Sequence, residues 1–291
     1  MNTYLLSSLL VQGLILGSTY ALLGVAFQIV YSTTRIFHLA QALVYTAAAY
    51  GATITVAKLG APLWLGFIVG LATGVIVGIL IELGVYRTLR LRKASLLVLF
   101  LASLGVATAG AFLIQIIMGP YQQVFEGFPI TTWYIGSVPI TALQVTSMAV
   151  SWVCIAAVWL FLRKSKYGFA VLGVSENPNM AGAVGVNQAR VNVLVLAIGS
   201  ALASVAAMFF TMGAAANPQM GTTPTFIGFV AVFFGGISSL LGSALGGFIL
   251  GMVASLSGLF VSTDYANVVM FGFLFLLLVF RPQGLFGQKS R

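Results

Sequence analysis

Long apolar segments, separated by short breaks that contain Gly, Pro or charged residues, dominate the pattern of hydrophobic positions along this chain. Such segments predict membrane-spanning helices, because about 20 apolar residues in a helix cross the hydrocarbon core of a bilayer. A further apolar stretch, 226–262, is too long for one span and is interrupted at "GGISSLLGS", so it predicts a broken or re-entrant helix pair. The predicted full spans are 4–30, 36–57, 62–83, 94–118, 141–162, 191–214 and 265–280.

Composition supports an all-α polytopic membrane protein with about seven full transmembrane helices plus the broken pair. Hydrophobic residues make up 60% of the chain, charged residues only 6%, and the mean hydropathy is +1.09. A soluble domain has about half apolar and about a quarter charged residues. We therefore expect a single transmembrane domain over 1–291, and any soluble module must be supplied by another chain. The opening "MNTYLLSSLL" lacks a basic region, so it predicts a retained first span.

The basic residues predict the orientation of the spans. The net charge of +9 comes from short clusters beside apolar runs, which is typical of cytoplasmic loops and does not indicate nucleic-acid binding. This bias places a loop at 163–190 in the cytoplasm, a loop at 119–140 outside, the N-terminus outside and the C-terminus in the cytoplasm. The clusters are Arg87, Arg90, Arg92 and Lys93; Arg163, Lys164, Lys166 and Arg190; and Arg281, Lys289 and Arg291.

Small residues recur at every fourth position in two spans. In lipid there is no hydrophobic drive for helix association, so such faces allow close backbone approach and predict helix packing. One span has a ladder of four glycines, and the other has a mixed Ser and Gly ladder. The first consists of Gly66, Gly70, Gly74 and Gly78, and the second of Ser243, Gly247, Gly251 and Ser255.

Catalytic and metal-binding patterns are absent from the sequence. It contains no P-loop, HExxH or GxSxG motif, and with one histidine and one cysteine no metal site of usual composition is expected. Acidic residues, namely Glu82, Glu126, Glu176 and Asp264, are expected in loops or at span ends, solvated or paired with Arg. Three polar residues of the second predicted span, His38, Gln41 and Tyr45, are candidates to line a solute pathway, although such groups also hold helices together.

The cytoplasmic loop contains the signature of a short helix in "SENPNMAGAVG". Asn177 is a good N-cap, Pro178 suits the first helical position, and Gly185 suits the left-handed residue that ends a helix. About two turns are unstable alone, so this helix must dock on something, with Met180 and Val184 as a small apolar ridge. It is either a connector on its own protein's surface or a coupling helix for a cytoplasmic motor protein, in which Glu176, Asn179 and Ala181 also take part.

Three segments resemble the permease subunits of bacterial ABC importers of the branched-chain or hydrophobic amino-acid type. They are "YGFAVLGVSENPNMAGAVGVNQARV", "VAVFFGGISSLLGSALGGFILG" and "FRPQGLFG". The wider importer class has Glu-Ala-Ala, three residues and Gly in its coupling loop. Here the pattern falls on Asn179-Met180-Ala181 and Gly185, so only the Ala and the Gly match.

The resemblance implies the partners of this chain. They are a second permease subunit, two cytoplasmic ATPase subunits that bind ATP and Mg, and a substrate-binding protein outside the cell. It also implies a bacterial inner-membrane location and no cofactor in this chain.

The second predicted span departs from the family in a way that bears on the solute. Family members often carry Asn-Phe-Ala-His-Gly followed by an acidic residue, where this chain has His38-Leu39-Ala40-Gln41-Ala42-Leu43. The resemblance implies amino acids of the branched-chain or hydrophobic type as solutes, and urea, amides and other small organic solutes stay open within the family.

Two readings from other classes remain. A secondary carrier or channel would need an ionisable group at the membrane midplane or inverted repeats with broken helices in both halves. An integral-membrane enzyme would need a nucleophile with a base or a metal cluster. The sequence has one clear helix break and no midplane acid, which favours the importer subunit.

Overall fold

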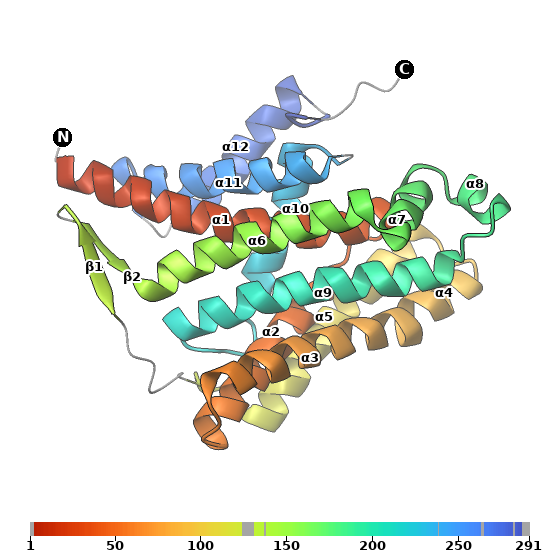
Figure 1. Cartoon of the computed structure of the whole chain (residues 1–291), viewed down its shortest axis with the longest axis horizontal. Helices are drawn as coiled ribbons and strands as arrows, with labels where there is room; N and C mark the ends of the chain where they lie inside the picture. Colours follow the sequence, from red (N-terminus) through yellow and green to blue (C-terminus); the bar gives the residue numbers. More distant parts are fainter. Residues whose placement is uncertain are drawn as a thin grey trace. The chain divides into compact units, whose positions relative to one another are not determined.

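The computed structural model describes residues 3–123, 131–136, 138–237, 239–262, 265–281 and 283–286. Glu126, Asp264, Lys289 and Arg291 lie outside these residues. The regular structure of the described part is helical apart from one short hairpin, made of β1 (Thr132–Ile135) and β2 (Val138–Thr141), which the sequence analysis did not predict. The helices are α1 (Thr3–Thr34), α2 (Gln41–Thr53), α3 (Leu63–Ile81), α4 (Arg87–Leu91), α5 (Leu96–Met118), α6 (Ala142–Lys164), α7 (Lys166–Glu176), α8 (Pro178–Ala183), α9 (Gln188–Gly213), α10 (Thr222–Gly235), α11 (Leu240–Leu256) and α12 (Ala266–Phe280) (Figure 1).

Within the described residues, six helices are long and apolar enough to cross a membrane, and they confirm the all-α polytopic fold. One of these runs from Leu63 to Leu91, because a π-helical segment, Glu82–Tyr86, joins α3 to α4 without a break. The others are Tyr4–Thr34, Leu96–Met118, Ala142–Lys164, Gln188–Gly213 and Leu240–Leu259.

Two of the predicted spans are shorter in the structure. The span expected at 36–57 becomes helical only at Gln41, because Arg35 ends α1 in the left-handed region with φ 56° and residues 36–40 are irregular. It ends in a second π-helical segment, Ile54–Lys58. The helix expected at 265–280 is α12, whose 15 residues extend about 22 Å at 1.5 Å per residue.

The predicted break in 226–262 lies between α10 and α11. Gly236, with φ 106°, ends α10, and Ser239 begins α11 by accepting a hydrogen bond at its Oγ from the Gly242 N–H at 2.9 Å. With 14 residues α10 is short for a span, whereas α11 continues through a 3₁₀ turn to Leu259. The stretch therefore combines one short helix with one helix of spanning length.

By its internal contacts the chain forms two compact units. The first comprises 1–28, 128–155 and 227–291, and the second comprises 29–127 and 156–226. Each unit has its own close-packed helices. The single domain expected over 1–291 stays a prediction.

In the first unit α11 packs against α1 through small residues. A Cβ added at Gly17 would lie 2.7 Å from the Phe248 carbonyl oxygen, and Gly247 and Gly251 meet the backbone of α1 in the same way. The Ser255 hydroxyl donates to the Leu9 carbonyl at 2.7 Å. Since the backbones touch, the second small-residue ladder is the face by which α11 lies along α1 (Figure 1).

The C-terminal motif "FRPQGLFG" closes the helix break of the same unit. The N–H groups of Leu285 and Phe286 donate to the carbonyls of Phe234 and Gly235 at 2.9 and 3.0 Å. These carbonyls belong to the last turn of α10 and would otherwise lack partners. Gly284 adopts φ 77° beside the backbone of Gly236, so a side chain there would be strained.

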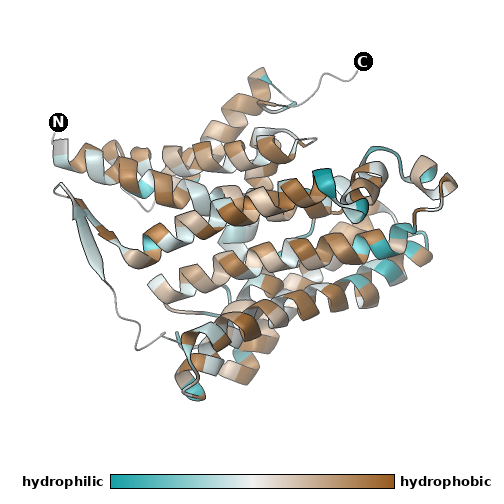
Figure 2. Ribbon diagram, viewed as in Figure 1, coloured by the Kyte–Doolittle hydropathy of each residue, from teal (hydrophilic) through white to brown (hydrophobic). Residues whose placement is uncertain are grey.

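In the second unit α3 lies between α2 and α9 along the four-glycine ladder. All four glycines are buried. A Cβ at Gly70 would lie 2.8 Å from Met208 Sδ of α9 and 2.9 Å from the Ala48 carbonyl oxygen of α2, and one at Gly74 would meet the Ser204 hydroxyl. Along α3 and α9 the residues are mostly hydrophobic, with hydrophilic residues gathered around α4 and the start of α9 (Figure 2). The three helices approach closely because the glycines of α3 have no side chains to hold α2 and α9 away.

We expect Gly74→Leu to destabilise this unit. The leucine would displace α9 at Ser204, and overpacking costs about 1–3 kcal/mol, which should lower the melting temperature in detergent by several degrees. Gly105→Leu is the matched control, because Gly105 of α5 has no atom within 4 Å of an added Cβ. Equal melting temperatures for the two variants would contradict the packing role.

Candidate functional site

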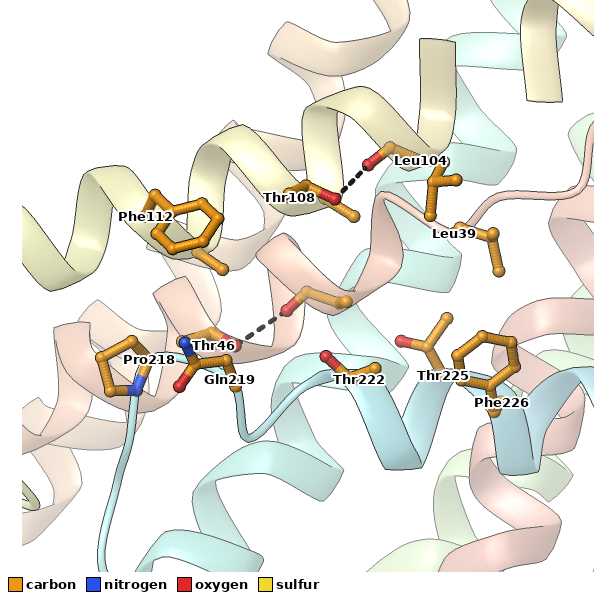
Figure 3. Close-up of a pocket in the computed structure, with 13 residues that line it drawn as sticks. Leu39, Thr46, Leu104, Thr108, Phe112, Pro218, Gln219, Thr222, Thr225 and Phe226 are labelled. Carbon is orange, nitrogen blue, oxygen red and sulfur yellow. Dashed lines mark hydrogen bonds between the residues drawn. The ribbon is translucent and has the colours of Figure 1, made fainter. Parts of the chain in front are cut away.

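A cavity of about 260 Å³ lies in the second unit between α2, α5 and the segment that leads into α10. Its wall is mainly aliphatic and aromatic, with threonine hydroxyls and one glutamine amide that can form hydrogen bonds (Figure 3). None of the residues that line it is charged. They are Leu39, Ala42, Thr46, Leu104, Ala107, Thr108, Ala111, Phe112, Pro218, Gln219, Thr222, Thr225 and Phe226.

Thr46 holds one wall of the cavity to α2. Its Oγ1 accepts a hydrogen bond from the Gly221 N–H at 3.2 Å and donates to the Ala42 carbonyl at 2.9 Å. The Thr225 hydroxyl donates to the Gly221 carbonyl at 2.8 Å. A Cβ at Gly221 would collide with the Ala42 carbonyl, so only glycine lets this segment lie against α2.

The three pathway candidates lie beside the cavity and not among its lining residues. His38, Gln41 and Tyr45 are all buried, whereas Leu39, Ala42 and Thr46 are the residues of this segment that face the cavity. The Tyr45 hydroxyl lies 3.5 Å from the Ala206 carbonyl oxygen, and neither amide atom of Gln41 has a hydrogen-bond partner. Their role in a pathway stays a prediction.

His38 belongs to a buried hydrogen-bonded chain that joins three elements. Its Nδ1 lies 2.8 Å from the Tyr86 hydroxyl, which donates to Ser103 Oγ at 2.7 Å. The same Ser103 oxygen accepts from the Ala40 N–H at 2.9 Å, just before α2 begins. The irregular segment that leads into α2 is thus fixed both to the π-helical part of the Leu63–Leu91 helix and to α5.

Glu82 is buried and forms an ion pair with Arg90. Its burial differs from the solvated position that was one of the two expectations for the acidic residues. The physical reason is that the helix does not end at residue 83 but continues through the π-helical segment to Leu91. About two further turns bring Arg90, eight residues after Glu82, within reach of the carboxylate. Pairing with a nearby arginine, the other expectation, is confirmed.

The loop 163–190, which was expected on the cytoplasmic side, contains α7 and α8. Asn177 caps α8 by accepting the Met180 N–H at Oδ1 (3.0 Å), Pro178 is its first residue, and Gly185 follows its end with φ 86°. These local predictions are confirmed, although α8 ends at Ala183 and has only six residues. The sequence analysis missed α7. Its start could have been recognised from Ser165, a good N-cap residue, whose Oγ accepts a hydrogen bond from the Gly168 N–H at 2.8 Å.

The short helix α8 rests on its neighbours by one side. Ala181 is buried, and α8 contacts α7 and α9. Met180 and Val184 are 63% and 75% exposed, so the apolar ridge is unpaired within the chain. Asn179 is also exposed, and Glu176 is the last residue of α7. These residues form an open surface whose binding to another protein stays a prediction.

One end of the second unit carries nearly all of its positive charge. The contacts of the glycine ladder make α3 antiparallel to both α2 and α9, so the start of α2, the end of α4 and the start of α9 lie together. Every Lys and Arg of this unit except Lys58 lies in or next to these termini or in the α6–α8 region. In the described residues no group of three His, Cys, Asp or Glu could hold a metal.

Comparisons with known proteins agree with a polytopic all-α membrane permease. A family described as the branched-chain amino acid transport system permease component matches residues 9–279. The high-affinity branched-chain amino acid transport system permease protein LivH of Escherichia coli is 30% identical over 96% of this chain and 94% of its own length. BraD of Pseudomonas aeruginosa, with the same description, is 30% identical over 97% and 95%. The chain belongs to this permease family.

A solved structure shares the fold. PsaBC from Streptococcus pneumoniae, in complex with a Fab, gives a TM-score of 0.53 with 15% sequence identity over 97% of this chain and 94% of that chain. At this identity the likeness concerns the arrangement of helices alone.

We expect Thr46→Val to weaken the junction between α2 and the cavity wall. Valine keeps the shape but leaves the buried Gly221 N–H without its acceptor, at a cost of about 1–3 kcal/mol. The measurement is the melting temperature in detergent. Thr108→Val is the control, because the exposed Thr108 hydroxyl bonds only within its own helix, to Leu104 at 3.0 Å. A Thr46 variant that melts no lower than this control would show that the junction contributes nothing.

Proposed function

We propose that this chain is the membrane-spanning permease subunit of an ATP-driven importer of small amino acids of the branched-chain or hydrophobic type. The match to the permease family over residues 9–279 carries the transport role. The nature of the cavity supports the solute class. Its apolar wall suits an aliphatic side chain, and its hydroxyl and amide groups can hydrogen-bond to a polar head group.

The uncharged lining favours a solute without net charge. A charged group is costly to remove from water unless it meets a partner, and the cavity offers none. A zwitterionic amino acid has no net charge, and its ammonium and carboxylate groups can form hydrogen bonds with the threonine hydroxyls and the Gln219 amide of the lining. Urea and amides also have no net charge, but they would not use the apolar wall. Hydrophobic amino acids therefore fit better than the smaller polar solutes of the family.

The exposed ridge of α8 supports coupling to a motor. In this proposal the ATPase subunits bind ATP and Mg and dock on Met180 and Val184, while this chain has no enzymatic activity and needs no cofactor of its own. A second permease subunit, identical or homologous, and an extracellular binding protein complete the importer. LivH and BraD are named as permease proteins of transport systems, which is the same role.

The charge distribution supports an orientation. Cytoplasmic ends of membrane proteins are rich in Lys and Arg, so the basic end of the second unit, with α8, faces the cytoplasm of a bacterial cell. The N-terminus is then outside and the C-terminus inside. The hairpin β1–β2, with Trp133 and Tyr134 exposed, belongs to the outer side, where aromatic residues suit the membrane interface.

We expect Gly185→Val to uncouple transport from ATP hydrolysis. A β-branched residue is strongly disfavoured at φ 86°, so the end of α8 and its ridge should shift. Uptake in proteoliposomes and ATP hydrolysis by the assembled complex are measured together. Gly185→Asn is the control, because asparagine tolerates this conformation. Wild-type coupling in the valine variant would refute the role of α8.

The energy source separates an importer from a carrier. Uptake in proteoliposomes should require the binding protein, the ATPases and ATP, and it should survive ionophores that collapse the proton and sodium gradients. The physical reason is that the cavity has no group that changes charge or binds a coupling ion. Gradient-driven uptake by this chain reconstituted alone would establish a carrier instead.

A further inference from the structure

A short irregular segment connects the cytoplasmic helices of the second unit to the cavity. The segment follows α1 and precedes α2, and it begins at Arg35, whose left-handed backbone is held by a hydrogen bond from its N–H to the Tyr31 carbonyl at 2.9 Å. The next N–H, of Ile36, donates to Thr34 Oγ1 at 3.2 Å. These two hydrogen bonds fix the backbone conformation of Arg35 and Ile36, the first two residues of the segment.

The first residue of this segment reaches the cytoplasmic helices. The Arg35 guanidinium donates to the Ser175 carbonyl at 3.0 Å, in the last turn of α7. Ser175 lies two residues before Asn177, which caps α8. A displacement of α8 by a bound partner would move this carbonyl, because α7 and α8 are joined without an intervening loop and contact each other.

The other end of the segment forms part of the cavity. Leu39 lines the cavity, and its neighbours Ala40 and His38 are tied to Ser103 and Tyr86 by the buried hydrogen bonds described above. Only three residues lie between Arg35 and Leu39. A displacement of the Arg35 guanidinium would therefore be transmitted through this short hydrogen-bonded segment to the cavity wall and to the first turn of α2.

We propose that Arg35 is a positioning residue that couples movement of α7 and α8 to the cavity wall. This inference rests on the proposed importer function and adds the residue through which the cytoplasmic signal reaches the transport site. Arg35 suits this role because guanidinium has several donors and a long reach, so it can follow a moving carbonyl. Arg35 itself does not touch the solute.

The decisive variant is Arg35→Gly. Glycine adopts positive φ without strain, so the backbone turn is kept while the guanidinium is removed. We expect the complex to assemble and to hydrolyse ATP at its basal rate, whereas the number of solute molecules imported per ATP falls about fivefold, as loss of one solvent-exposed hydrogen bond would give. Arg35→Lys should restore part of this ratio, because lysine keeps a charged donor of similar reach.

Arg190→Ala is the matched control. Arg190 is an exposed basic residue at the same end of the unit, in the first turn of α9, and its removal should leave the import-to-hydrolysis ratio unchanged. If Arg190→Ala lowers the import-to-hydrolysis ratio as much as Arg35→Gly does, the effect is a general one of positive charge, and the proposal is overturned.

Two further results would also overturn it. The first is an Arg35→Gly complex with the wild-type ratio. The second is loss of co-purifying ATPase subunits, which would make Arg35 a direct docking contact. The wild-type complex is measured first: if its uptake does not require ATP, the importer function itself fails. If wild-type uptake requires ATP and the Arg35→Gly ratio is unchanged, only the coupling role fails.

Discussion

Close backbone contact along faces without side chains is the constraint on which the second unit depends. Lipid offers no hydrophobic drive for helices to associate, so dispersion contacts between tightly packed surfaces must supply it. The four glycines of α3 let α2 and α9 approach on the same face, where added Cβ atoms would meet Ala48, Ser204 and Met208. In this way α2 becomes an interior helix.

The burial of α2 explains the character of the cavity. A helix that faces protein can carry Gln41, Tyr45 and Thr46, which would be costly in contact with lipid. Thr46 uses its hydroxyl to bind the backbone of the segment before α10, and this contact places Gln219, Thr222 and Thr225 opposite α5. The resulting cavity has hydrogen-bonding groups but no charged residue in its lining.

Much of the fold and of the loop 163–190 followed from local rules. Apolar length predicted most spans, the interruption near 236–239 predicted the α10–α11 break, and cap chemistry placed α8 to within a residue at each end, because Asn177, Pro178 and Gly185 act on their own backbone. The cavity could not be predicted in this way. Leu39, Phe112 and Phe226 resemble other apolar residues in the sequence, and only packing of distant segments makes them neighbours.

The sequence by itself determined that this chain is an all-α polytopic membrane protein, since hydropathy, charge bias and helix signals act over a few turns, whereas the permease type rested on the resemblance of three segments to a known family. Only the tertiary structure decided which polar residues meet. It buried His38 against Tyr86, 48 residues later in the chain, and it placed the Arg35 guanidinium on the carbonyl of Ser175, 140 residues away. Contacts of such separation depend on how whole helices pack, and no local pattern encodes them.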